Sequence, residues 1–172
     1  AQLAATRAAA DGGAQIALMN PGGLRANLTA AADGAVRYED LFAVQPFYNN
    51  LVTLTLTGAQ IVQVLEQQWL NQPRPRVLQV SKGFAYAWDN TKPAGQRVVA
   101  GSVMFDGRPL DAAASYRVTV NSFLAAGGDN FGAFKQGRDV RTGMMDVDAF
   151  EQFIAKRPLG EAVALDRIKR VN

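Results

Sequence analysis

The chain contains neither histidine nor cysteine among its 172 residues. It therefore cannot supply an imidazole base, a thiol nucleophile, a disulfide or a histidine or cysteine metal site. The net charge of +3 is spread over interspersed acids and bases, without the dense basic cluster typical of nucleic-acid binding. No apolar run approaches the roughly 18 residues of a membrane-spanning helix, so no membrane span is expected.

These absences favour a domain that binds over one that reacts. An Asp/Glu pair or an activated Ser/Lys pair could still perform chemistry, but neither pair shows a convincing spacing in this sequence. We therefore assign no catalytic residue and no metal ligand to this chain. A small anionic ligand remains compatible with the positive net charge.

The length fits one domain, residues 1–172. Ala1 to Ala10 is helix-forming from its first residue, without a cap or an initiator methionine. It also lacks the charged, apolar and small-residue zones of a signal peptide. We therefore expect a fragment of a longer protein, cut inside or just before a helix.

Hydrophobic periodicity predicts an α+β fold, in which helices pack against mixed or antiparallel sheets. Strands are expected where apolar residues alternate or run together, and helices where apolar residues recur on one face. Predicted strands are 15–19, 51–56, 77–80, 84–88, 97–105, 115–121 and a closing strand at 162–171; predicted helices are 1–10, 38–43, 58–70 capped by Thr57, and 147–156 ended by Pro158.

Three segments at the ends of these elements are candidates for ligand contact. The first, Asn20 to Arg25 (NPGGLR), follows a short buried strand. Its glycines allow the backbone to approach a bound group closely, and its arginine brings a fork of donors suited to phosphate, carboxylate or sugar oxygens. A surface turn with an arginine is an equally good interpretation of this segment alone.

The second and third segments, Gln45 to Asn50 and Asn121 to Phe131, combine aromatic and polar residues. Phe47 and Phe123 could stack on a flat ring, and Asp129 could accept hydrogen bonds from sugar hydroxyls. Each residue also has a structural interpretation, since a phenylalanine beside a strand is usually core and an aspartate in a glycine loop is usually a cap or turn residue. Local chemistry alone supports a small-molecule binding domain with a nucleotide-like ligand.

Other conspicuous residues are expected to be structural. Two phenylalanines at and just after the end of the third segment and both tryptophans are predicted to pack in the core, and four arginines are predicted to be solvated loop charges. These residues are Phe131, Phe134, Trp69, Trp88, Arg74, Arg76, Arg138 and Arg141.

Taken together and in order, the three segments resemble the C-terminal domain of the 5'-nucleotidase family, which includes UDP-sugar hydrolases. The family pattern is Asn-x-Gly-Gly-Ile/Leu-Arg, then Pro-Phe-Gly-Asn, then Asn-x-Phe-x-x-x-Gly-Gly-Asp-Gly-Phe. Asn20 to Arg25, Pro46 to Asn49 and Asn121 to Phe131 match it in sequence. The resemblance covers nearly the whole chain. Tyr48 and Asn130 depart from it, because the family often has glycine at both positions.

The resemblance implies a nucleoside site within a two-domain metallophosphoesterase. Two divalent metal ions would belong to a separate N-terminal domain, and the chain itself would hold no cofactor and show no hydrolase activity alone. The resemblance also implies which residues bind the substrate. Six of them lie in the three motifs, and Gly83, the weakest candidate, lies in the turn at 81–83; the six are Asn20, Arg25, Phe47, Asn49, Phe123 and Asp129.

The resemblance further implies a periplasmic or extracellular location. Two alternatives stay open at this stage. The chain could be a stand-alone nucleotide-binding module, or a degenerate domain that serves only assembly. The second alternative predicts that Phe47 and Phe123 are buried in the core.

Overall fold

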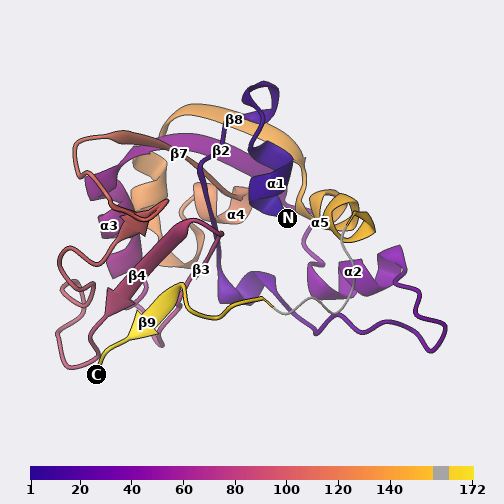
Figure 1. Ribbon diagram of the computed structural model, residues 1–172, viewed down its shortest axis with the longest axis horizontal. Coiled ribbons are helices and arrows are strands. Elements are labelled where there is room, and N and C mark those ends of the chain that lie inside the picture. Colours follow the sequence, from indigo (N-terminus) through magenta and orange to yellow (C-terminus); the bar gives the residue numbers. More distant parts are fainter. Residues whose placement is uncertain (157–162) are drawn as a thin grey trace.

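The computed structural model describes residues 1–156 and 163–172. Its larger sheet has five strands in the order β3-β1-β7-β2-β8 (Figure 1). Strand β1 runs parallel to β7, and the other neighbours pair antiparallel. These strands are β1 (Ile16–Met19), β2 (Asn50–Thr57), β3 (Gln79–Val80), β7 (Ser115–Asn121) and β8 (Arg138–Met145).

A smaller four-stranded sheet has the order β6-β5-β4-β9. Strand β9 pairs in parallel with β4, so the end of the chain lies beside a strand from its middle (Figure 1). The strands are β4 (Phe84–Trp88), β5 (Met104–Phe105), β6 (Arg108–Pro109) and β9 (Ile168–Arg170).

Helices flank the larger sheet. Helix α3 begins after Thr57, whose hydroxyl accepts from the Gln60 backbone N–H while the Gln60 side chain accepts from the Thr57 N–H; this reciprocal pair is a capping box. Its buried face joins the core between the sheets. The helices are α1 (Gln2–Thr6), α2 (Tyr38–Val44), α3 (Gly58–Glu66), α4 (Ser122–Ala125) and α5 (Asp146–Ala155).

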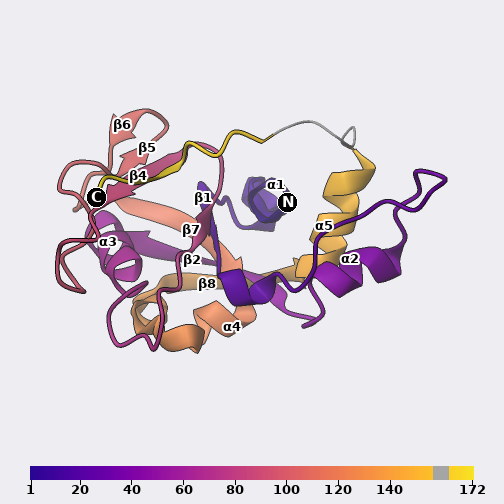
Figure 2. The same cartoon turned by 90° about the horizontal axis from the view of Figure 1, so that it is seen from below.

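Helix α1 is fixed on the sheet by buried hydroxyls rather than by apolar contacts alone. The Thr6 and Thr119 hydroxyl oxygens lie 2.8 Å apart, and Thr119 and Thr53 lie 2.7 Å apart. Figures 1 and 2 show α2 and α5 side by side at one end of the molecule, away from α3. In the described ranges, no helix is both long and apolar enough to cross a bilayer.

The predicted fold class is confirmed, with helices packed on two mixed sheets. Thr57 caps α3 as predicted. Phe131 and Phe134 are core residues, 0% and 1% exposed. The predicted helix end at Pro158 and strand start at Ala162 lie outside the described residues.

The predicted strand 97–105 is wrong over most of its length, since only Met104–Phe105 forms a strand. The reason is a competing acceptor on α3. The Glu66 carboxylate accepts the backbone N–H groups of Arg97 and Val98 at 2.9 and 2.7 Å, so these donors are not available to a longer strand ladder, and only a single bridge joins Val98 to Trp88.

Candidate functional site

A cavity of about 340 Å³ opens where β1 and β7 end. Its lining comes from the turn after β1, the turn before β2, the loop that follows α3, and the segment after β7. The lining residues are Asn20, Gly22, Gly23, Arg25, Phe47, Asn49, Arg76, Asn121, Phe123 and Asp129. The structure thus brings the three predicted segments together in one place.

Two glycines in the turn after β1 leave room for the side chain of Asn20, the residue that follows the strand. Pro21–Gly23 forms a single 3₁₀ turn, and the Asn20 side chain folds back over it. A Cβ at Gly23 would lie 2.4 Å from the Met19 methyl carbon and 3.1 Å from Asn20 Oδ1. A side chain there would require the end of Met19 to move and Asn20 to shift slightly, so the glycine allows Asn20 to pack closely on this turn.

A directional hydrogen-bond chain crosses the floor of the cavity. The Leu124 backbone N–H donates to Asn121 Oδ1, and Asn121 Nδ2 donates to Asn20 Oδ1, both at 2.9 Å. Asn20 Nδ2 then donates to Asp129 Oδ2 at 2.9 Å. A backbone donor at one end and a carboxylate acceptor at the other fix which way both amides point. Both asparagines are buried, at 3% and 1% exposed.

Arg76 is a site residue that the sequence interpretation missed, because it was predicted to be solvated. Its Nη1 lies 2.9 Å from Asp129 Oδ1, with the two side chains 25% and 12% exposed. Its Nε is buried and has no hydrogen-bond partner within the described ranges. Asp129 adopts a left-handed backbone with φ of 53°, and Gln72 Nε2 donates to its carbonyl at 2.6 Å. The carboxylate is therefore held by Asn20 and Arg76, one at each oxygen, and the Asp129 backbone is held by Gln72.

Two phenylalanine rings are exposed at the cavity. Phe47 is 48% and Phe123 is 45% exposed, unlike the buried Phe131 of the same segment. The Arg25 guanidinium lies 5.7 Å from the Phe47 ring centroid, a cation–π arrangement. A Cβ at Gly128 would lie 2.6 Å from the Phe123 ring, so this glycine makes room for the exposed ring.

The two departures from the family pattern are accommodated by the backbone. Tyr48 and Asn130 both have positive φ, 51° and 62°, the conformation in which glycine is favoured. The Tyr48 ring packs on Phe42, with centroids 4.8 Å apart. Tyr48 is not among the residues that line the cavity.

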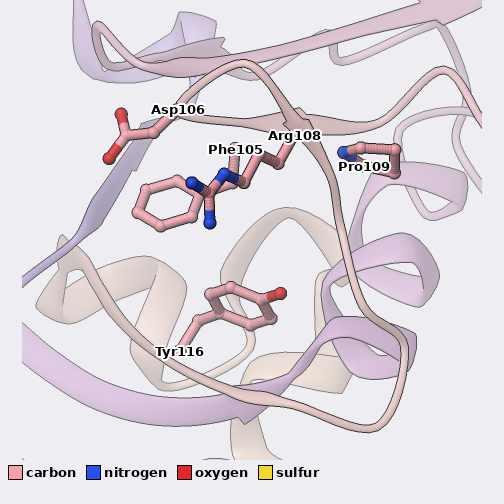
Figure 3. Close-up of a pocket in the computed structure, with 5 residues that line it drawn as sticks. All are labelled: Phe105, Asp106, Arg108, Pro109 and Tyr116. Carbon is pink, nitrogen blue, oxygen red and sulfur yellow. The ribbon is translucent and has the colours of Figure 1, made fainter.

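Gly83 is not brought into this cavity. It lies in the turn between β3 and β4 with φ of 90°, where a Cβ would collide with the Asp106 carboxylate. Asp106 borders a second cavity of about 420 Å³ at the β5–β6 hairpin, lined also by Phe105, Arg108, Pro109 and Tyr116. Figure 3 shows the Asp106 carboxylate directed away from the Tyr116 ring.

The first cavity joins aromatic faces to a fixed carboxylate and two guanidinium groups, which are the elements of a site for a ring-bearing, hydroxyl-rich ligand. The family described as the 5'-nucleotidase, C-terminal domain, matches residues 1–136. The chain belongs to this family.

Known proteins resemble the chain over most of its length. It is 36% identical to a cell wall protein of Listeria monocytogenes, with 87% of this chain and 19% of that protein covered. It is 31% identical to a 5'-nucleotidase of Vibrio vulnificus, with 83% and 24% covered. The crystal structure of a 5'-nucleotidase precursor from Thermus thermophilus superimposes with a TM-score of 0.82 at 38% identity, covering 99% of this chain and 34% of that one.

The chain therefore spans between about a fifth and a third of the length of these relatives. It corresponds to one part of a larger protein in each of them.

Proposed function

We propose that this chain is the nucleoside-binding domain of a 5'-nucleotidase-type phosphoesterase. A base would stack between Phe47 and Phe123, the ribose hydroxyls would donate to Asp129, and Arg25 with Asn20 would contact base, ribose or phosphate oxygens. The observation that carries the proposal is the single cavity in which two half-exposed phenylalanine rings meet an aspartate with both oxygens anchored.

The anchoring of Asp129 suits recognition of a diol. Each carboxylate oxygen has a second lone pair beyond the one used by Asn20 or Arg76, so two hydroxyls can still donate to it. Because the side chain is already ordered, binding costs less conformational entropy than it would for a free aspartate. The two guanidinium groups at the cavity favour a ligand with a negative charge.

The full protein would join this domain to an N-terminal metallophosphoesterase domain. Two divalent ions held there would supply an activated water and stabilise the charge on the phosphate, while this chain binds and orients the nucleoside. In the described part of the chain, no three acidic side chains gather in an arrangement suited to a metal ion. The proposal assigns the metal ligands to the other domain and expects this chain alone to be inactive.

A periplasmic or extracellular location accompanies this proposal, and the relative that is a cell wall protein supports it. The alternative of a domain for assembly alone requires Phe47 and Phe123 in the core, whereas both rings are nearly half exposed. A stand-alone nucleotide-binding module is the second candidate, because residues of this chain line a cavity with both aromatic and charged groups.

Titration of the chain with adenosine, AMP and UDP-glucose, followed by amide chemical shifts, tests the proposal. We expect saturable shifts concentrated at Asn20 to Arg25, Phe47 to Asn49 and Phe123 to Asp129. Absence of shifts at about millimolar ligand, where even weak sites fill, would reject nucleoside binding by this chain. The coding sequence before Ala1 separates the two candidates, since acidic and histidine-rich metal motifs there support the enzyme.

A further inference from the structure

A buried carboxyl group stands directly behind the cavity. Asp146 is the first residue of α5 and is 1% exposed, and its backbone N–H donates to the Asn49 carbonyl at 2.8 Å. It is not among the lining residues, and it lies beyond residues 1–136 that match the family. Burying a carboxylate costs free energy unless it has hydrogen-bond partners, so the groups around Asp146 matter for the role of this residue.

Asp146 is joined to Asn49 through its backbone N–H, and the Asn49 side chain and the Val147 backbone N–H act on the Asp146 carboxyl as donors that lower its pKa. On the other side, Ser122 Oγ donates to Asn49 Oδ1 at 3.1 Å. The amide of Asn49 is therefore held between an acceptor at its nitrogen and a donor at its oxygen. One N–H and one oxygen lone pair of this amide remain for a ligand.

The amide lies where the aromatic part of a ligand would be. Asn49 follows Phe47 by two residues, and its partner Ser122 precedes Phe123. Both rings line the same cavity as Asn49. The amide is thus placed to meet the polar edge of a ring stacked on these phenylalanines.

We propose that Asp146 is a positioning residue that locks the Asn49 amide in one orientation and thereby lets the cavity discriminate a 6-amino purine from a 6-oxo purine. The inference rests on the proposed nucleoside site. Adenine presents a donor beside an acceptor, the pattern that a side-chain amide pairs with. Hypoxanthine presents the reversed pattern at its N1 and O6 atoms, which only a flipped amide would match.

The Asn49 amide keeps one orientation because an ionised carboxylate can only accept hydrogen bonds. Ser122 alone would not fix this orientation, since a hydroxyl can act as donor or as acceptor. Asparagine at position 146 would have nearly the same shape but could donate to a flipped Asn49. The substitution Asp146→Asn should therefore release the orientation without removing the packing.

Protonation of Asp146 should release the lock in the same way, because a protonated carboxyl can donate. Burial raises the pKa of Asp146 to about 6, although the hydrogen bonds from Val147 and Asn49 lower it in part, and the like charge of Asp148 raises it further. The Tyr38 hydroxyl donates to Asp148 Oδ1 at 3.1 Å. No histidine occurs in the sequence to titrate in the same range.

Other charged groups lie on the elements packed against α5. Helix α2 brings two acids in addition to Tyr38, β8 brings charges of both signs, and α1 carries no charged side chain within Gln2–Thr6. These groups are Glu39, Asp40, Arg138, Asp139 and Arg141.

The test is calorimetric titration of the chain with adenosine and with inosine. At about pH 8 we expect wild type to bind adenosine roughly tenfold or more tightly than inosine, the discrimination of one well-placed amide. Asp146→Asn should bring this ratio close to one. Asp148→Asn is the matched control, because it removes the same charge from the same helix turn without touching Asn49, and it should keep the ratio.

The pH profile of wild type is a second readout that needs no variant. Its ratio should fall between about pH 8 and about pH 5 as Asp146 becomes a donor, while the ratio of Asp146→Asn stays low throughout. A wild-type ratio near one, or an unchanged ratio in Asp146→Asn, overturns the inference and leaves the nucleoside site standing. Binding of neither nucleoside by wild type rejects the site and the inference together. If Asp146→Asn does not fold, the wild-type pH profile decides.

Discussion

Phe123→Ala separates a ligand-stacking ring from a core ring. The Phe123 side chain is 45% exposed and lines the cavity. If it stacks on a base, its removal should cost roughly 1–3 kcal/mol of binding free energy. That loss corresponds to about a fivefold to 150-fold rise in the dissociation constant for adenosine.

The same substitution should cost little stability. Truncation of a fully buried phenylalanine costs about 3–5 kcal/mol, but nearly half of this ring already faces solvent. We therefore expect Phe123→Ala to lower the free energy of unfolding by about 1–2 kcal/mol. Phe131→Ala is the matched control in the same segment, because Phe131 is 0% exposed and packs on Phe134 with ring centroids 6.2 Å apart.

Urea unfolding and calorimetric titration of both variants give the two free energies side by side. Phe123→Ala should lose affinity and keep most of its stability, whereas Phe131→Ala should lose about 3–5 kcal/mol of stability. The opposite result for Phe123→Ala, a loss of 3 kcal/mol or more with affinity unchanged, would show that its ring is part of the core and would remove it from the site.

Three further outcomes are expected. Asp129→Asn should abolish the preference for adenosine over 2',3'-dideoxyadenosine, measured as the ratio of their dissociation constants. Arg76→Gln should weaken adenosine binding by about 1 kcal/mol by loosening Asp129; unchanged affinity would assign Arg76 to the scaffold. Because burial raises the pKa of Asp146 from 3.8 to about 6, the folded state binds this proton more tightly than the unfolded chain. The bound proton contributes at most about 3 kcal/mol to the free energy of unfolding. This contribution is fully present below pH 3.8 and is lost as pH rises through about 6. Urea unfolding should show this fall in stability with rising pH in wild type and not in Asp146→Asn.

Much of the fold could be predicted because its central elements carry strong local signals. The alternation in 51–56 and 115–121 corresponds to β2 and β7, which pair without interruption from Leu51 to Thr57. Strand β8 carried no such signal, since its sequence RDVRTGMM is charged and largely exposed at the sheet edge. Its pairing with β2 is interrupted by two register shifts, so periodicity could not reveal it.

The site was predictable to the extent that its residues lie in compact motifs. Asn20, Phe47 and Phe123 stand in short segments whose composition points to a ligand. Arg76 does not stand in such a segment. It lies in the loop 71–76, which prolines interrupt, and a basic residue in a loop of this kind is usually solvated. Its role arises only when folding brings Asp129 within 2.9 Å, a contact between segments that no local pattern encodes. Asp146 was hidden for a related reason, since an acid in the first turn of a helix has an ordinary explanation.

Two asparagines of the cavity are held in the same way, and this similarity bears on what the site recognises. The Asn20 amide lies between the Asn121 amide and the Asp129 carboxylate, and the Asn49 amide lies between Ser122 and Asp146. The amide of an unrestrained asparagine can flip and so match many ligands. Two amides of fixed orientation match fewer ligands, because each presents its donor and its acceptor in a defined order.

The two carboxylates that fix these amides differ in their surroundings. Asp129 borders the cavity and is paired with Arg76, whereas Asp146 is buried and has one oxygen, Oδ1, without a hydrogen-bond partner in the described ranges. A buried carboxylate without a counter-ion disfavours its charged form, so mild acid should release the Asn49 end of the cavity.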